Sequence, residues 1–104
     1  MTDIEIVEKE YAELQEIFKD WTSISSAEEF DSKIRHTNIT QMNACQYDGD
    51  FCYCDFDYKH LSTTISYTEE GGFTLSDVAS LYDDGGNWHG DFELTNGKAT
   101  LVTY

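Results

Sequence analysis

The chain has 104 residues, of which 21 are acidic and six are basic, so its formal charge at pH 7 is −15. This length supports one hydrophobic core and excludes a second. Its two Trp, seven Tyr and six Phe residues argue against a disordered acidic chain. We therefore expect a single domain over residues 1–104, with a helical segment at 1–37 and an antiparallel sheet at 38–104.

The first predicted helix carries apolar residues at steps of three or four, a spacing that places them on one side. Thr2 and Glu5 have the spacing of a capping box at its start. The apolar side is formed by Ile4, Val7, Tyr11, Leu14, Phe18 and Trp21. The opposite side is an acidic ridge that contains Glu5, Glu13, Glu16 and Asp20, with Lys9 as its basic residue.

A second, short helix is predicted to begin at Ser25 or Ser26 and to end near Asn38, with Phe30 and Ile34 on its buried side. After about residue 38 the apolar period changes to two, which predicts strands. One strand covers 50–58. Its even-numbered side chains share one face, and its other face includes Asp55 and Asp57.

Two dipeptides, Asp48-Gly49 and Asn96-Gly97, predict two-residue hairpin turns, because a type I′ turn needs positive φ at both central positions. Segment 73–82 fits a strand and also a helical spacing, and we expect a strand that enters a short turn or helix. The chain is therefore predicted to be α+β, with two N-terminal helices packed on an antiparallel sheet of four to six strands.

The turn at Asn96-Gly97 also sets the register of the last hairpin. It predicts that Asp91 and Glu93 point away from the core. The core side of the hairpin then holds Trp88, Phe92 and Leu94, with Leu94 opposite Ala99 and Phe92 opposite Leu101.

The three cysteines are predicted to cluster on the first hairpin. A turn at Asp48-Gly49 places Cys45 directly opposite Cys52, at roughly 5.5 Å between Cα atoms, with Cys54 as a diagonal neighbour. An odd number of cysteines cannot all pair within the chain, and zinc normally takes four ligands. We expect three buried thiols, with a thiolate metal site or a redox disulfide as the alternatives.

The sequence contains no recognisable motif for a cofactor, a metal ion or a catalytic nucleophile, and we expect a protein without them. The paired acids near turns do not fit the twelve-residue calcium loop. His36, His60 and His89 are available as bases, but neither a nucleophile elbow nor a phosphate-binding loop accompanies them.

The dominant feature of the sequence is its excess of acidic residues, which are distributed over the whole chain. Residues 1–35 carry ten acids and four bases, and residues 36–104 carry eleven acids and two bases. A folded surface of this charge repels nucleic acid and anionic membranes and attracts basic proteins. A carboxylate array can also occupy a groove that is built for phosphates.

We therefore expect a non-enzymatic inhibitor that binds a basic, nucleic-acid-handling protein such as a nuclease and acts as a nucleic-acid mimic. Phage anti-defence proteins, directed against CRISPR or restriction nucleases, share this composition, which is an analogy only. The expected partner-binding residues are Glu5, Glu13, Glu16, Asp20, Asp55, Asp57, Asp91 and Glu93.

Two alternatives stay open. An immunity protein that neutralises a nuclease toxin has the same profile, and a small enzyme would have a concave site around His60 or His89. Residues 1–20 contain no apolar run long enough for a signal peptide or a membrane span. Together with the odd number of cysteines, this predicts a cytoplasmic protein, in the host cytoplasm if it is encoded by a phage.

Overall fold

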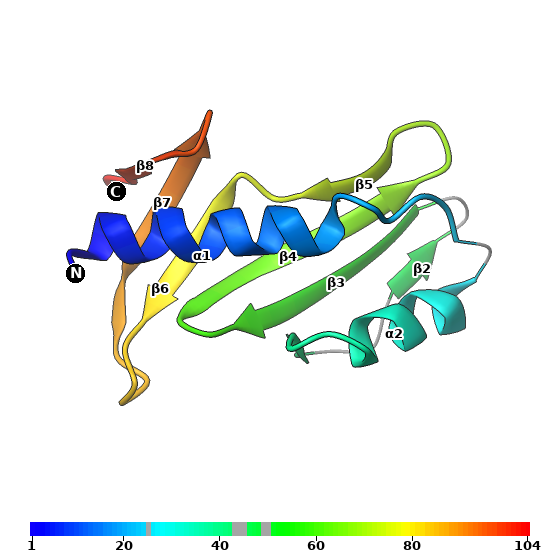
Figure 1. Ribbon diagram of the computed structural model, residues 1–104, viewed down its shortest axis with the longest axis horizontal. Helices are drawn as coiled ribbons and strands as arrows, with labels where there is room; N and C mark the ends of the chain where they lie inside the picture. Colours follow the sequence, from blue (N-terminus) through cyan, green and yellow to red (C-terminus); the bar gives the residue numbers. More distant parts are fainter. Residues whose placement is uncertain (25, 43–45, 49–50) are drawn as a thin grey trace.

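Two helices lie on one face of an open antiparallel sheet (Figure 1). The computed structural model describes residues 1–24, 26–42, 46–48 and 51–104. The helices are α1 (Asp3–Phe18) and α2 (Ala27–Arg35). The strands are β1 (Thr40–Gln41), β2 (Gln46–Asp48), β3 (Phe51–Tyr58), β4 (Leu61–Thr68), β5 (Gly72–Leu75), β6 (Val78–Tyr82), β7 (Trp88–Thr95) and β8 (Lys98–Leu101).

The sheet has the order β1-β3-β4-β6-β7-β8. β2 also pairs with β3, and β5 also pairs with β4, so the eight strands form a sheet that is six strands across. This architecture confirms the predicted α+β fold. Within the described residues, neither helix has the length and the apolar composition that crossing a bilayer requires.

Both helices begin where the sequence predicts. Thr2 and Glu5 form the capping box of α1, and the Ser26 side chain accepts a hydrogen bond from the Glu29 backbone N–H at the start of α2. The apolar side of α1 is confirmed for Val7, Tyr11, Leu14 and Phe18, whereas Ile4 is 45% exposed and Trp21 lies beyond the end of the helix. The core instead includes a carboxylate, Glu10, whose residue surface is only 6% exposed.

Segment 73–82 contains no helix. β5 ends at Leu75 and the chain resumes as β6 at Val78, so only residues 76 and 77 interrupt the strand. The Tyr11 hydroxyl of α1 donates to the Ser76 carbonyl at 2.8 Å, and the Thr63 hydroxyl donates to the Val78 carbonyl at 2.7 Å. These two bonds satisfy the carbonyl group of Ser76 in the interruption and that of Val78 at the start of β6.

The last hairpin has the predicted turn and register. Asn96 and Gly97 have φ of 52° and 80°, and Leu94 pairs with Ala99. The position of Trp88 was predicted wrongly, because β7 has an irregular register opposite Leu81 and Tyr82. This β-bulge re-aims the side chain. Trp88 is therefore 55% exposed and pairs with Tyr82 instead of joining the core.

The first hairpin is displaced from its predicted register. Asp48 pairs with Phe51, and Tyr47, not Cys45, lies opposite Cys52. The displacement leaves the alternation of β3 unchanged, because the buried face of that strand is set by its own apolar residues. The predicted turn residue Gly49, together with Cys45, lies outside the described residues.

A further hairpin joins β3 and β4, where the sequence carries no Gly or Asn signal. Tyr58 pairs with Leu61, so Lys59 and His60 form the turn, and Lys59 has a φ of 52°. A lysine rarely adopts this left-handed conformation. Contacts from α1, described below, hold the turn in place.

The turn at Asn96-Gly97 yields a stability prediction. Replacing Gly97 with Val should lower the free energy of unfolding by about 1 kcal/mol or more, because a β-branched residue is strained at positive φ. No atom lies within 4 Å of a Cβ built at Gly97, so crowding does not contribute. Urea denaturation measures the change, and Gly97→Asn, which tolerates positive φ better, should lose less. Equal stability of both variants would contradict the assigned turn.

Candidate functional site

The face of the sheet turned away from the helices is called the outer face here. It is formed by the side chains that alternate with the core residues along the strands. Many of its members are serines and threonines, such as Ser62, Thr64 and Ser66 of β4. Among the described residues, its charged and large apolar members include Met42, Tyr53, Asp55, Asp57, Val78, Tyr82, Trp88, Asp91, Glu93 and Lys98.

Among the described residues, the outer face therefore carries four carboxylates and one ammonium group. All four acids were predicted as partner-binding residues. Asp57 and Glu93 have no hydrogen-bond or ion-pair partner among the described residues. Their charges are directed to solvent, because no described element covers this face (Figure 1).

Asp91 organises the aromatic part of the outer face. It accepts hydrogen bonds from the Ser80 hydroxyl at 2.6 Å, from the Trp88 indole at 3.0 Å and from the Tyr104 hydroxyl. These donors lower the pKa of Asp91, the Ser80 hydroxyl most. The bond from the indole fixes the orientation of the exposed Trp88 ring.

A hollow of about 280 Å³ lies at one end of the outer face and is called the outer hollow. Met42 and Tyr82 supply apolar walls, and Asp57 supplies a carboxylate. Lys59, His60, Leu61, Ser62 and Gly86 complete the lining. Hollows with an apolar wall and a few polar groups are typical places for an anchoring side chain of a binding partner.

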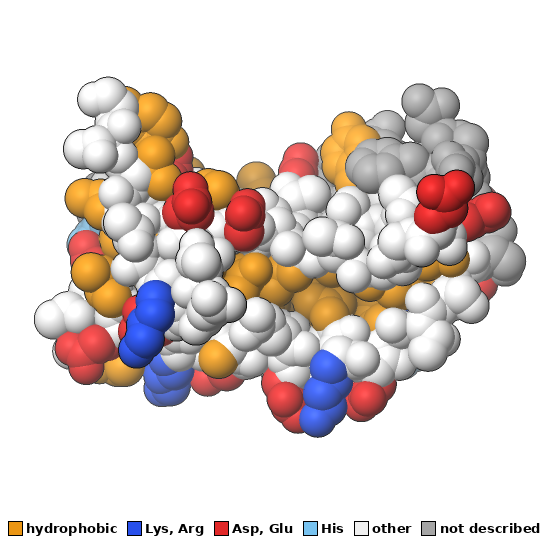
Figure 2. All heavy atoms as spheres, turned by 90° about the horizontal axis from the view of Figure 1, so that it is seen from above, with side chains coloured by type: hydrophobic (Ala, Val, Ile, Leu, Met, Phe, Trp, Pro, Cys, Tyr) orange, Lys and Arg blue, Asp and Glu red, His pale blue; other side chains and the backbone are white. Residues whose placement is uncertain are grey.

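The other four predicted residues, Glu5, Glu13, Glu16 and Asp20, lie on the helix side of the domain. The structure thus separates the eight acids into two groups on opposite faces of the domain. A single flat binding surface on a partner protein cannot contact both groups. Figure 2 shows that the visible Lys and Arg side chains gather along one edge, whereas acidic side chains lie along both. Three lysines, Lys9, Lys19 and Lys59, accompany the helix acids.

Each acid of α1 has a partner within the chain. Glu5 caps the helix, Glu16 pairs with Lys19, and Glu13 accepts from the Lys59 ammonium group at 2.7 Å and the Tyr58 hydroxyl at 2.9 Å. The hydrogen bonds from Lys59 and then Tyr58 lower the pKa of Glu13. Glu8 accepts from the backbone N–H of Ala99 at 2.9 Å, which covers part of the β8 edge.

Glu10 makes the most buried of these contacts. One oxygen accepts from the His60 backbone N–H at 2.8 Å, and the other lies 2.7 Å from His60 Nδ1. Together with Glu13, it attaches the Lys59-His60 turn to α1. The sequence analysis did not select Glu10. Its position between Val7 and Tyr11 on the apolar side was the available signal, because an acid there must find a donor.

A second hollow, of about 210 Å³, is lined by His60 and His89 and is called the histidine hollow. His60 Nε2 lies 2.9 Å from Asp84, while His89 lies 3.2 Å from Asp3 and 3.1 Å from Asp83. Asp3, Ile6, His60, Leu81, Tyr82, Asp83, Asp84 and His89 line it. Hydrogen bonds to Glu10 and then Asp84 raise the pKa of His60, and those to Asp83 and then Asp3 raise the pKa of His89.

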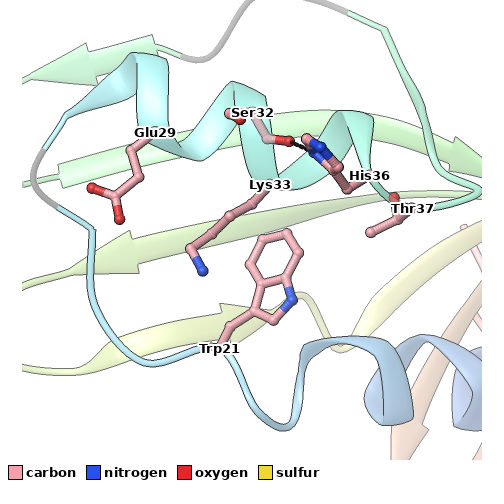
Figure 3. Close-up of a pocket in the computed structure, with 6 residues that line it drawn as sticks. All are labelled: Trp21, Glu29, Ser32, Lys33, His36 and Thr37. Atoms are coloured by element: carbon pink, nitrogen blue, oxygen red, sulfur yellow. Dashed lines mark hydrogen bonds between the residues drawn. The ribbon is translucent and has the colours of Figure 1, made fainter.

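A groove of about 520 Å³ lies between α2 and Trp21 (Figure 3). The Lys33 ammonium group lies 5.5 Å from the centre of the Trp21 ring, and His36 Nδ1 lies 2.6 Å from the Ser32 carbonyl oxygen. Edge-to-face contacts with Phe18, Phe30 and Phe73 extend the core to Trp21. Trp21 therefore has a structural role, and the groove holds none of the predicted site residues.

The cysteines differ from the expected three thiols. Cys52 and Cys54 are both fully buried. Cys52 is disulfide-bonded, so the alternative of a disulfide holds at this position, whereas Cys54 is a thiol. Burial raises the pKa of the Cys54 thiol to about 11. Cys45, the third member of the expected cluster, lies outside the described residues.

The cysteines yield a second prediction. Without reductant, iodoacetamide at pH 8 should modify Cys54 slowly in the folded protein and rapidly in urea, because burial blocks access and suppresses the thiolate. Cys52 should be modified only after reduction. Peptide mass spectrometry measures both rates, and rapid modification of either cysteine in the folded, unreduced protein would contradict the structure.

The Glu10 contact yields a third prediction. Glu10→Ala should lower the free energy of unfolding by about 2 kcal/mol or more, because it leaves a buried backbone N–H and a charged imidazole without their acceptor. Glu16→Ala, which removes a solvent-exposed carboxylate from the same helix, serves as the control and should change stability little. If the two variants are equally stable in urea denaturation, Glu10 does not anchor the turn.

Comparison of the chain with protein-family models, with curated proteins and with solved structures finds no match to any of them.

Proposed function

We propose that this chain is a small acidic inhibitor that binds a basic, nucleic-acid-handling protein through the outer face of its sheet. The observation that supports this most directly is the contrast between the acids of α1 and two acids of the outer face. Every acid of α1 has a partner within the chain, whereas Asp57 and Glu93 on the outer face have none among the described residues. Asp55 and Asp91 accept hydrogen bonds from neighbouring strands, and Asp20, beyond the end of α1, has no such partner among the described residues. Unpaired surface carboxylates are the groups that attract and orient a basic partner.

The apolar residues of the outer face support the same proposal. Met42 and Trp88 are 58% and 55% exposed, and Val78 and Tyr82 are also exposed. Interface cores are enriched in aromatic residues and methionine, and charged groups are found at the rim. In this proposal Trp88 and Tyr82 bury apolar area, while the carboxylates set the encounter rate and the orientation of the partner.

Mimicry of nucleic acid is the finer part of the proposal. Alternate residues on a strand are about 6.8 Å apart, so Asp55 and Asp57 present two negative charges in a row. Lysines and arginines that bind phosphates can pair with such a row and lose the pairing as salt rises. We propose a phage anti-defence role, with immunity to a nuclease toxin as the alternative. Co-purification from the native host, followed by mass spectrometry, distinguishes a defence nuclease from a toxin.

A small enzyme is the second candidate, because the histidine hollow lies between His60 and His89. Its geometry does not favour base catalysis. Each of the four ring nitrogens lies within 3.3 Å of a carboxylate oxygen, so none of them faces the hollow without a partner. A general base needs a nitrogen lone pair directed at its substrate.

We also propose a cytoplasmic location, because nucleic acid and the proteins that process it meet there. The disulfide at Cys52 argues against this, since disulfides are rare in a reducing cytosol. The redox state of Cys52 in rapidly quenched cells tests the proposal. A quantitatively oxidised Cys52 would place the protein in an oxidising compartment.

The fourth prediction compares two pairs of charge reversals that alter the net charge equally. Asp57→Lys with Glu93→Lys on the outer face should lower the association rate with the captured partner by roughly tenfold at low salt. Glu16→Lys with Asp20→Lys on the helix side should have a smaller effect. Trp88→Ala should instead raise the dissociation rate, because it removes buried area. Surface plasmon resonance at several salt concentrations measures these rates.

The results separate the possible interfaces. A larger effect of the helix pair would assign the interface to the acidic ridge. Binding that neither pair alters, and that does not weaken with salt, would show that charge does not drive association.

A further inference from the structure

We propose that His60 and His89 form a proton-dependent latch that fastens the turn of residues 83–87 to α1. Each imidazole ring connects a carboxylate of α1 with a carboxylate of this turn. His60 connects Glu10 with Asp84, at 2.7 and 2.9 Å. His89 connects Asp3 with Asp83, at 3.2 and 3.1 Å.

The chemistry of the contacts requires protonated rings. A carboxylate only accepts hydrogen bonds, so a ring with a carboxylate at both nitrogens must donate from both. The imidazolium has two N–H groups, whereas neutral imidazole has one. Loss of one proton therefore removes one of the two connections that each ring makes.

At His60 the connection to the turn is the one that breaks. Glu10 is buried and must keep its donor, while the Asp84 side chain is 98% exposed and can be hydrated by water. The remaining N–H therefore stays on Nδ1, opposite Glu10. Deprotonation of His60 therefore releases Asp84 and removes one of the two connections between the turn and α1, while His89 holds the other.

The turn keeps its own shape when the latch opens. Asp83 accepts hydrogen bonds from the backbone N–H groups of Gly85 and Asn87, each at 2.9 Å. The contact from the Asn87 backbone foremost, and then the hydrogen bond from His89, lower the pKa of Asp83 to about 2, so Asp83 stays charged over the range in which histidine titrates. The latch therefore changes how the turn is attached and leaves its internal hydrogen bonds intact.

The charged and titratable groups around the two rings come from every element that packs against them. α1 supplies Asp3 and Glu10, and the turn supplies Asp83 and Asp84. Lys59 and Asp57 share the outer hollow with His60, and the Tyr82 phenol lines both hollows. The carboxylates that contact the rings raise the pKa of both above the ordinary histidine value of about 6.5.

The direction of the pH effect follows from this sign. A group whose pKa is raised on folding contributes stability that is fully present below its unfolded pKa. This contribution is lost as the pH rises through the folded pKa. The latch is therefore closed at mildly acid pH and opens as the pH rises through the folded pKa values of the two rings, which lie above the ordinary histidine value.

The turn joins Tyr82 to Trp88, which are both exposed aromatic residues of the outer face, so the latch can control how they are presented. This consequence for partner binding rests on the proposed function. The latch itself does not, and it can be tested on the isolated protein.

The fifth prediction is tested by NMR titration of ¹⁵N-labelled protein between pH 5 and 9. Both rings should show two protonated nitrogens at pH 6, and each should titrate above the ordinary midpoint. The amide signals of residues 84–86 should shift with the same midpoints, and their order parameters should fall as the rings lose their protons. The Asn96-Gly97 turn, at the other end of β7, is the internal control and should not follow these midpoints.

Two conservative variants identify the contacts. Asp84→Asn should lower the midpoint of His60, and Asp3→Asn should lower that of His89, each with little effect on the other ring. Both carboxylates are solvent-exposed, so both variants should fold. Three results would each overturn the latch. The rings could titrate at the ordinary histidine midpoint, their midpoints could stay unchanged in these variants, or the amide signals of the turn could fail to shift with the rings.

Discussion

The buried carboxylate of Glu10 is the constraint on which the rest of the structure depends. A charge removed from water requires donors at close range, and Glu10 obtains two of them from one residue, His60. The position of the β3–β4 turn relative to α1 is thereby fixed. Lys59 can occupy its unfavourable left-handed conformation because its ammonium group pairs with Glu13 one helical turn further along. The longest hairpin of the sheet is thus held by two acids of the helix.

The same contacts explain how a strongly acidic domain of this size stays compact. Negative charges on α1 are paired with lysines, histidines, hydroxyl groups and backbone N–H groups, so their mutual repulsion is reduced where they are closest together. Asp3, Glu8 and Glu10 reach across to β7, β8 and the β3–β4 turn, respectively. The acids of α1 therefore have structural roles, whereas Asp57 and Glu93 on the other side of the sheet have no partner among the described residues. This separation moves the proposed interface from the helix to the outer face.

The proposed interface and the proposed latch meet at one turn of the chain. Residues 83–87 join β6 to β7 beside the β-bulge that exposes Trp88, and the same turn is attached to α1 by the two histidines. A change of protonation on the helix side can therefore alter the presentation of aromatic residues on the outer face. His60 and Tyr82 line both the outer hollow and the histidine hollow, so the two hollows are adjacent. A change in one hollow can therefore reach the other without a rearrangement of the core.

The sequence by itself determined the elements whose signals are local. The capping box of Thr2 and Glu5, the apolar stripe of α1, the alternation of β3 and the turn at Asn96-Gly97 depend on neighbouring residues, and the structure contains each of them. The tertiary structure decided what depends on distant partners. Glu10 is buried because His60, fifty residues away, supplies its donors, and segment 73–82 is two strands because Tyr11 and Thr63 satisfy the carbonyl groups at the interruption. The helix acids and the sheet acids lie on opposite faces because α1 packs on the even-numbered side of β3, and no helical or strand period in the sequence specifies how two distant elements face each other.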